Sequence, residues 1–223
     1  MPDKIKNLLE LAPDERANLM ISLLSKGISG KVLDVMKSIP REYFISSEHF
    51  AEAYHDKPLP IDNGQTISQP YTVGFMTDLL EVKPSDKILE IGTGSGYQAL
   101  ILFKLGAKVY SVERIQELFD RSVRTFFDFG CNGIHSILGD GSLGAPEYAP
   151  FDKIIVTAAS PKVPQELKNQ LSTGGIMVIP VGSRESQTML KIKKINDSYF
   201  EKTEYSNFRF VPLIGSSGWN TNE

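Results

Sequence analysis

Apolar residues recur along this chain with two spacings, and the change between them divides the sequence. In the first part, leucines at Leu8, Leu11, Leu19 and Leu23 recur at roughly helical intervals, which predicts helices over much of the first 45 or so residues. A further helix is expected over 31–38, before a proline that would end it. Residues 56–71 are rich in proline and predict a loop, which a helix over 72–80 follows.

From residue 87 onward, short apolar runs alternate with helical patterns. The expected strands are 87–91, 108–112, 135–138, 151–157 and 175–181, and the expected helices between them are 97–106, 115–129 and 164–171. Such an alternation indicates a parallel sheet covered on both faces. Residues 188–195 and the region around 207–213 predict an antiparallel hairpin at one edge. We expect a single α/β domain, with residues 1–80 as helical cap and substrate loop and residues 81–223 as sheet core.

Composition narrows the class of protein. The chain has 223 residues, 41% of them apolar, which is enough to bury the core of one large domain. A net charge of −3 argues against sequence-independent nucleic-acid binding. The single cysteine excludes an internal disulfide, and the three histidines have no metal-like spacing, so no metal is expected. Charges interrupt the first 20 residues, and no apolar run elsewhere approaches membrane length, which predicts a cytoplasmic protein without a signal peptide or membrane span.

A glycine-rich stretch directly follows the first expected strand. Residues 90–97 read EIGTGSGY, with Gly92, Gly94 and Gly96 alternating with small hydroxyl residues. Glycines after a strand let the backbone approach a ligand, with the N-terminus of the next helix facing it. The dinucleotide fingerprint would need a third glycine where this chain has Tyr97. The stretch therefore disfavours NAD and FAD and leaves another nucleoside ligand open.

Acidic and small residues also follow the next three strands, at the sheet edge where ligands bind. Glu113 ends the second strand, about 20 residues after the glycines, where a carboxylate can accept both hydroxyls of a ribose. Asp140, between Gly139 and Gly141, suits hydrogen bonding to an adenine edge, and Thr157 leaves room for a ligand. Each signal alone is often a turn or a surface acid. Their placement after successive strands indicates a nucleoside-type cofactor.

S-adenosylmethionine fits this pattern because it carries a ribose and an adenine but no phosphate. Its amino-acid end can lie against the glycine loop, which includes Thr93 and Ser95, with Glu90 just before it. The E-x-G-x-G-x-G pattern, Glu113 followed by Arg114, and the late hairpin resemble class I S-adenosylmethionine-dependent methyltransferases. That resemblance implies a Rossmann-like sheet, mostly parallel, with an antiparallel C-terminal edge.

The segment before the sheet narrows the resemblance further. The stretch GQTISQPY at 64–71 is similar to a segment of protein-L-isoaspartate (D-aspartate) O-methyltransferases. Other blocks similar to this family, in the same order, are IPREYF at 39–44, LEIGTGSGYQA, SVER, GDG, PFDKIIVTAA and RFVPL at 209–213. Methyltransferases of other substrate classes share the glycine loop but not GQTISQP. Within IPREYF, we interpret Arg41 and Phe44 as anchors of the helical cap.

The resemblance implies repair of damaged proteins. Members of the family methylate the free α-carboxylate of isoaspartyl residues, and the ester then collapses to a succinimide. By resemblance, Ser68 is the active-site serine, and Gln65, Thr66, Ile67 and Ser68 border the cofactor. Gln69, Val211, Pro212 and Leu213 would contact the substrate. The implied partners are isoaspartyl peptides and proteins, with activity on D-aspartyl residues open, and we expect a monomer.

The chemistry of a carboxylate acceptor agrees with the residues present. A carboxylate is ionised at neutral pH and needs no general base. Orienting it towards the methyl group can lower the activation barrier by about 7–11 kcal/mol. The chain accordingly shows no Ser-His-Asp order and no paired-acid motif.

Two other hypotheses compete with this one. A methyltransferase for another small-molecule or protein acceptor would share the glycines, Glu113 and Asp140, but has no reason to contain GQTISQP. A non-catalytic binding module would be indicated by loss of Ser68 or of the glycine loop, and the chain has both.

Overall fold

The computed structural model describes residues 3–220, and the chain enters it through a layer of helices. The elements before the main sheet are α1 (Asp3–Leu11), α2 (Pro13–Ser25), α3 (Gly30–Lys37), the 3-10 helices η1 (Arg41–Phe44) and η2 (Ser47–Glu52), β1 (Leu59–Pro60), η3 (Asp62–Gly64), β2 (Thr66–Ile67) and α4 (Pro70–Leu80). The helices expected over 31–38 and 72–80 are confirmed to within two residues. None of the helices within residues 3–220 is both long and apolar enough to cross a membrane.

A seven-stranded sheet follows. Its strands are β3 (Lys87–Ile91), β4 (Lys108–Glu113), β5 (His135–Leu138), β6 (Phe151–Val156), β7 (Leu171–Gly182), β8 (Gln187–Lys194) and β9 (Phe200–Phe208). The connections contain α5 (Tyr97–Lys104), α6 (Gln116–Asp128), η4 (Gly141–Leu143), η5 (Pro146–Tyr148) and α7 (Gln165–Gln170). All five strands expected in the parallel part are present.

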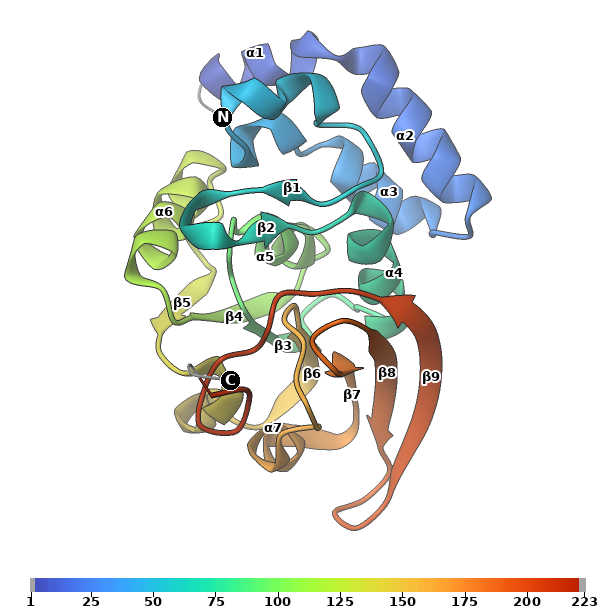
Figure 1. The fold of residues 1–223 in the computed structure, drawn as a ribbon, viewed down its shortest axis with the longest axis vertical. Coiled ribbons are helices and arrows are strands. Elements are labelled where there is room, and N and C mark those ends of the chain that lie inside the picture. Colours follow the sequence, from blue (N-terminus) through green and yellow to red (C-terminus); the bar gives the residue numbers. More distant parts are fainter. Residues whose placement is uncertain (1–2, 221–223) are drawn as a thin grey trace.

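The order of the strands locates the ligand-binding edge. The sheet runs β5-β4-β3-β6-β7-β8-β9, parallel from β5 to β7 and antiparallel at β8 and β9. From β3 the chain moves to β4 and β5 on one side, and later to β6 and β7 on the other (Figure 1). The order therefore reverses beside β3, and open sheets bind ligands beyond the carboxyl ends of the strands at such a point. The predicted fold class is confirmed.

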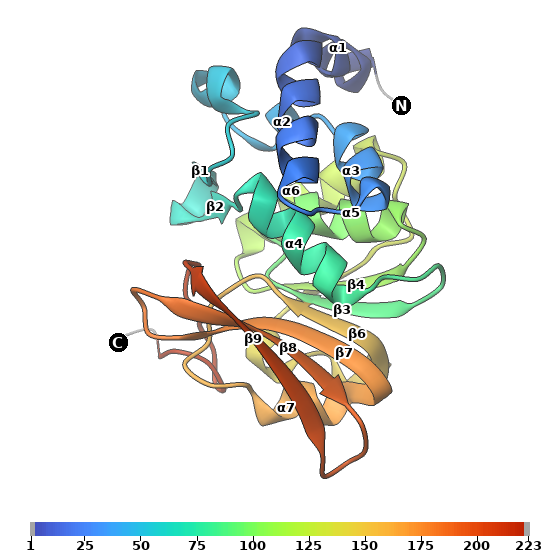
Figure 2. The same ribbon diagram turned by 90° about the vertical axis from the view of Figure 1, so that its right-hand side faces the viewer.

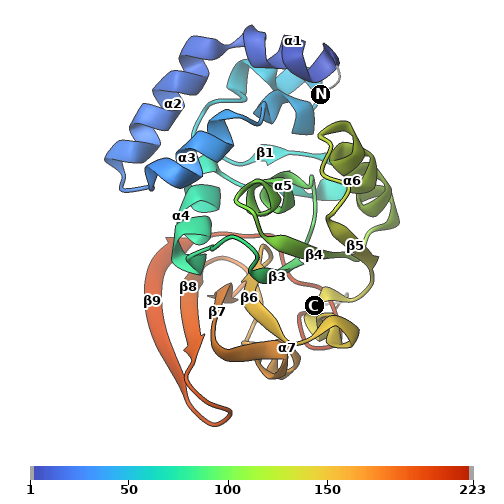
Figure 3. The same ribbon diagram turned by 180° about the vertical axis from the view of Figure 1, so that it is seen from behind.

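Both faces of the sheet are covered, as the apolar strands predict. Figure 2 shows α4 and α5 with the cap helices on one side of the sheet and α7 on the other, and Figure 3 shows α5 and α6 between the cap and β4 and β5. Neighbouring strand residues enter opposite cores: Ile88 packs with α4, α5 and the cap, whereas Leu89 packs with α7.

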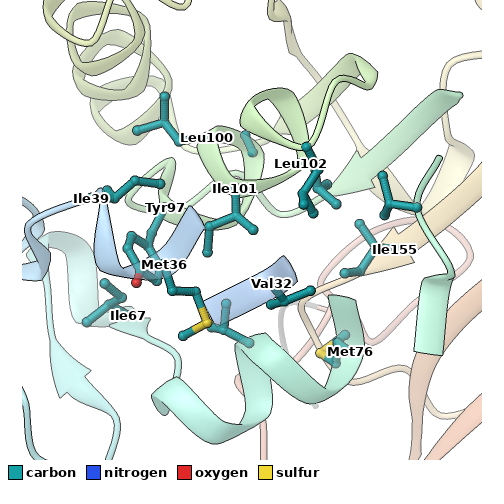
Figure 4. Close-up of a cluster of buried hydrophobic side chains, with 14 of the residues drawn as sticks. Val32, Met36, Ile39, Ile67, Met76, Tyr97, Leu100, Ile101, Leu102 and Ile155 are labelled. Atoms are coloured by element: carbon teal, nitrogen blue, oxygen red, sulfur yellow. The ribbon is translucent and has the colours of Figure 1, made fainter. Parts of the chain in front are cut away.

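The cap and the sheet share one of these cores. Val32 and Met36 of α3, Met76 of α4 and Ile155 of β6 belong to the same buried cluster (Figure 4). The apolar side chains of the cap and of the sheet therefore pack into one continuous core.

Two segments differ from the sequence-based expectation. The loop at 56–71 contains the β1–β2 ladder, in which Leu59 pairs with Ile67 and Pro60 with Thr66. The last strand is Phe200–Phe208 rather than the region around 207–213. This edge strand is largely exposed and polar, so it has no apolar run, whereas the apolar residues after it leave the sheet and cross towards the carboxyl ends of the strands (Figure 1).

Candidate active site

The glycine loop connects β3 to α5 and has a different requirement at each glycine. Gly96 is the N-cap of α5 with a φ of 84°, and a Cβ there would lie 2.9 Å from the ring of Phe126 on α6. Only glycine therefore lets α5 and α6 approach this closely. Gly94, with a φ of 52°, lines a cavity, and a Cβ there would have no protein neighbour closer than 4.0 Å. The loop thus opens its backbone to a ligand at Gly94.

A first cavity of about 130 Å³ lies beside this loop at the carboxyl ends of β3, β4 and β6. It is where most of the predicted site residues meet. Those that line it are Gln65, Thr66, Ile67, Ser68, Gly92, Thr93, Gly94, Ser95, Glu113, Arg114, Gly141, Thr157, Val211, Pro212 and Leu213. Predicted residues that do not line it are Gln69, Glu90, Gly96, Gly139 and Asp140.

Other lining residues were not expected from the sequence. They are Val73, Met76, Ile91, Tyr97, Gln98, Val112, Ile115, Leu118, Ala158 and Ile214. Most are apolar residues on strands and helices, where the hydrophobic pattern signals burial in general. That pattern does not separate a core position from a cavity wall.

Glu113 at the end of β4 holds the glycine loop as well as facing the cavity. Its Oε2 accepts a hydrogen bond from the Gly94 N–H at 2.9 Å, and its Oε1 accepts from the N–H groups of Arg114 and Ile115, both at 2.9 Å. A carboxylate offers about four acceptor positions, so one remains, on Oε2. Glu113 can therefore accept one further hydroxyl while it fixes the loop, rather than both ribose hydroxyls as the sequence predicts, because three backbone N–H groups already use its other acceptor positions.

Glu90 lies behind the loop rather than in the cavity wall. It is fully buried on β3, and its Oε2 accepts a hydrogen bond from Ser111, whose Oγ lies 2.5 Å from Thr93 Oγ1. Oε1 has no hydrogen-bond partner within residues 3–220. Burial raises the pKa of Glu90 to about 8, the Ser111 hydrogen bond opposes this, and the charge of Glu113 adds to it. Without a nearby cation, this carboxyl is mainly protonated at neutral pH.

Asp140 holds the C-terminal segment. Its Oδ1 accepts from the backbone N–H and the hydroxyl of Ser142, at 2.9 and 2.7 Å, and its Oδ2 accepts from the Ser216 N–H at 2.7 Å. Partial burial opposes ionisation, but these hydrogen bonds hold the pKa of Asp140 below its usual range. The neighbouring Gly141, rather than the Asp140 side chain, forms the cavity wall here.

A second cavity of about 510 Å³ adjoins the first. Its lining includes Gln69, three aromatic residues that the sequence did not single out, Tyr71, Phe208 and Phe210, and the exposed Arg209. The Gln69 side chain donates to the Asp56 carbonyl at 3.0 Å, so it braces the loop. Gln69 and Tyr71 lie at the start of α4, whereas Phe208, Arg209 and Phe210 lie at the end of β9 and directly after it. The second cavity therefore joins two segments that are far apart in the sequence.

Four residues line both cavities: Thr66, Ser68, Thr157 and Val211. The Ser68 hydroxyl has no hydrogen-bond partner in the described part of the chain, whereas its backbone carbonyl accepts from Arg41. Thr157 donates back to the Gly92 carbonyl at 2.7 Å, and Val211 is held because its carbonyl accepts from the Ala159 N–H at 2.8 Å. Within residues 3–220, the wall between the cavities thus has fixed backbone and two uncommitted hydroxyls, those of Thr66 and Ser68.

Solved structures share this fold. One described as a protein-L-isoaspartate O-methyltransferase has a TM-score of 0.83 at 28% identity, covering 91% of this chain and 67% of that one. Another, described as a protein-L-isoaspartate O-methyltransferase from Plasmodium falciparum in complex with S-adenosyl-L-homocysteine, has a TM-score of 0.77 at 24% identity, covering 88% and 97%. The fold and the site at its switch point define a class I S-adenosylmethionine-dependent methyltransferase.

Sequence comparison identifies the family. The family model Protein-L-isoaspartate(D-aspartate) O-methyltransferase matches residues 14–218. A protein-L-isoaspartate O-methyltransferase of Flavobacterium johnsoniae is 52% identical over 200 residues, covering 89% of this chain and 93% of the relative. One of Dictyoglomus thermophilum is 47% identical over 206 residues, covering 92% and 93%. The chain belongs to the protein-L-isoaspartate (D-aspartate) O-methyltransferase family, which confirms the sequence-based resemblance.

Proposed function

We propose that this chain transfers a methyl group from S-adenosylmethionine to the free α-carboxylate of L-isoaspartyl residues in damaged peptides and proteins. The resulting ester collapses to a succinimide, whose hydrolysis returns part of the residue to normal aspartate. The observation that carries the proposal is the wall shared by the two cavities, in which Ser68 presents an uncommitted hydroxyl. One cavity would take the methyl donor and the other the peptide.

The residues of the first cavity fit S-adenosylmethionine, which supplies an electrophilic methyl group on a sulfonium. Glu113 Oε2 has an acceptor position left for a ribose hydroxyl. The glycine loop exposes backbone at Gly94, next to the N-terminus of α5, where the helix dipole favours a carboxylate. The chain therefore offers complementary groups to the ribose and to the carboxylate of the amino-acid end.

The shared wall suits an acceptor that needs no deprotonation. None of Thr66, Ser68, Thr157 and Val211 can act as a general base at neutral pH. A substrate carboxylate is already ionised there, so the task of the wall is to hold one carboxylate oxygen in line with the methyl group. The Ser68 hydroxyl can donate to that carboxylate, and orientation of this kind contributes about 7–11 kcal/mol to lowering a barrier.

We also propose where and with what the enzyme acts. It is a cytoplasmic monomer, its partners are isoaspartyl peptides and proteins, and it binds neither nucleic acid nor membranes. A methyltransferase for another acceptor would share the first cavity but has no need of the GQTISQP loop. The relatives' names, which specify isoaspartate, support the repair function over that alternative.

The test compares paired peptides that contain either isoaspartate or normal aspartate at one position, with labelled S-adenosylmethionine. The two peptides differ in where one methylene lies, so only a site that fixes backbone and carboxylate together separates them. We expect kcat/KM for the isoaspartyl peptide to be higher by about 100-fold or more. Equal rates on both peptides would instead indicate a general carboxyl methyltransferase.

A further inference from the structure

Arg41 is a buried guanidinium that joins three segments of backbone. It begins η1 and is 1% exposed. Its Nη1 donates to the Ala53 carbonyl at 2.7 Å, and its Nη2 donates to the carbonyls of Lys57 and Ser68 at 3.0 and 3.1 Å. One side chain therefore joins η1 to the 53–57 turn and to Ser68.

The 53–57 turn is itself a support for the loop that carries Ser68. The Asp56 carboxylate accepts from the Tyr71 N–H at 2.8 Å, and the Asp56 carbonyl accepts from the Gln69 side chain at 3.0 Å. Arg41 thus holds both the turn and the residue that the turn supports. The planar guanidinium can reach several carbonyls at once, which the single ammonium of a lysine cannot reproduce.

A second observation couples the charge of Arg41 to a residue that lines the first cavity. Burial raises the pKa of Tyr97 to about 12, and the positive charge of Arg41 is the largest effect that opposes this rise. Tyr97 lines the first cavity, and Figure 4 shows it in the same buried cluster as Ile39 and Ile67, the apolar residues close to Arg41 and Ser68 in sequence. The Arg41 guanidinium therefore donates to the Ser68 backbone in the shared wall, and its charge affects Tyr97 in the wall of the first cavity.

We propose that Arg41 is a positioning residue for methyl transfer, which fixes the Ser68 carbonyl and through it the direction of the Ser68 hydroxyl. This inference rests on the proposed function, and it gives Arg41 a role beyond anchoring the cap. Since a displacement of about 1 Å can lower a rate about 100-fold, loosening the Ser68 backbone should lower kcat. It should leave the binding of the methyl donor nearly unchanged, because Arg41 donates to none of the glycine-loop residues.

The test is a double-mutant cycle with Arg41→Lys and Ser68→Ala, measured on an isoaspartyl peptide. Arg41→Lys alone is expected to lower kcat about 10- to 100-fold, with the calorimetric affinity for S-adenosylhomocysteine within about three-fold of wild type. In the Ser68→Ala background, Arg41→Lys should lower kcat by less than about three-fold, because the hydroxyl it positions is already absent.

Arg16→Lys is the matched control. Arg16 is also a buried cap arginine, and it donates to the Tyr54 hydroxyl and the Leu8 carbonyl. We expect it to lower the melting temperature with kcat retained within about two-fold, as for a residue with a purely structural role. If Arg41→Lys is poorly folded, Arg41→Gln measured well below its melting temperature takes its place in the cycle.

Two results would overturn the inference. One is an Arg41 variant that loses melting temperature but keeps wild-type kcat per folded molecule. The other is an equal loss of kcat in the presence and absence of the Ser68 hydroxyl. A wild-type enzyme that fails to prefer isoaspartyl peptides would overturn the proposed function instead, and the cycle would then be run on the carboxylate acceptor that it does methylate.

Discussion

Ser68 and Glu90 are two polar side chains whose hydrogen bonds are incomplete within residues 3–220, and both lie at or behind the cavities. Buried polar side chains in folded proteins normally have their hydrogen bonds satisfied. The Ser68 hydroxyl lines both cavities and is available to a ligand, whereas the Glu90 carboxyl is buried behind the glycine loop and affects stability instead. Each leads to a separate experiment.

Replacing Ser68 with alanine should reduce activity without reducing stability. A charge-assisted hydrogen bond contributes roughly 1.5–3 kcal/mol, and misalignment of the carboxylate adds to this, so kcat/KM should fall by about one to three orders of magnitude. The melting temperature should change little because the hydroxyl has no partner in the described chain. Kinetics and thermal unfolding of the same sample check both statements. Ser206→Ala, in the second cavity but outside the shared wall, is the control; full activity of Ser68→Ala would remove Ser68 from the site.

Glu90 should make stability depend on pH in the absence of cofactor. Its pKa is raised from 4.5 to about 8, so between these values the folded chain holds a proton that the unfolded chain releases. The free energy of unfolding therefore falls as pH rises through this window, by at most about 1.4 kcal/mol per pH unit. Glu90→Gln cannot titrate, so its melting temperature relative to wild type should rise between about pH 5 and about pH 8. Calorimetry with the exposed Glu117→Gln as control tests this, and a pH-independent difference would contradict it.

At the scale of elements, the segment after β9 forms part of the cavity wall. Its Leu213 and Ile214 line the first cavity, and Ser216 and Ser217 donate to Asp140 and Ser142. Gly215 lies so close to this pair that a Cβ would overlap the Asp140 carboxylate and approach Ser142 Oγ to 2.6 Å. The cavity wall at this end therefore depends on the absence of a side chain at Gly215.

Gly215→Ala should displace this segment and weaken cofactor binding. We expect the dissociation constant for S-adenosylhomocysteine to rise by about ten-fold, which corresponds to about 1.4 kcal/mol. Trp219, the single tryptophan, donates its indole N–H to the Ala159 carbonyl at 3.1 Å, so its fluorescence should change in the variant without ligand. Gly30→Ala, where a Cβ meets nothing within 4 Å, is the control. Unchanged affinity and fluorescence would show that the segment tolerates the extra methyl group.

The sequence predicts elements well where burial leaves a pattern and poorly where it does not. The parallel strands are buried on both faces, so stretches such as 87–91 read as continuous apolar runs. Phe200–Phe208 is an exposed edge strand, and β1 and β2 have two residues each, so neither carries a periodic signal. In the site, the positions of the glycine loop and of Glu113 could be predicted because each lies at the end of an apolar strand. The contact of Asp140 with Ser216 joins segments 76 residues apart, which no local pattern reveals.

At the scale of the whole molecule, the cap and the sheet share a core from Ile5 to Met189. Because neither part buries its apolar face alone, we expect one cooperative unfolding transition. Far-ultraviolet circular dichroism reports the helices and Trp219 fluorescence reports the C-terminal segment, and their urea-unfolding curves should superimpose. S-adenosylhomocysteine should move both midpoints together. Two separated transitions would show that the cap or the C-terminal segment unfolds independently.

The position of Ser68 also determines which client proteins the enzyme can serve. Ser68 is half-buried between two cavities, so an acceptor has to bring its main chain into the second cavity before a carboxylate reaches the hydroxyl. A residue held in a helix or sheet of its own protein cannot do this until that stretch opens. Opening free energies range from nearly zero at frayed ends to the full unfolding free energy in a core. On the proposed function, the lifetime of damage in a stable client is therefore set by the client's own fluctuations, and mobile tails and loops are restored first.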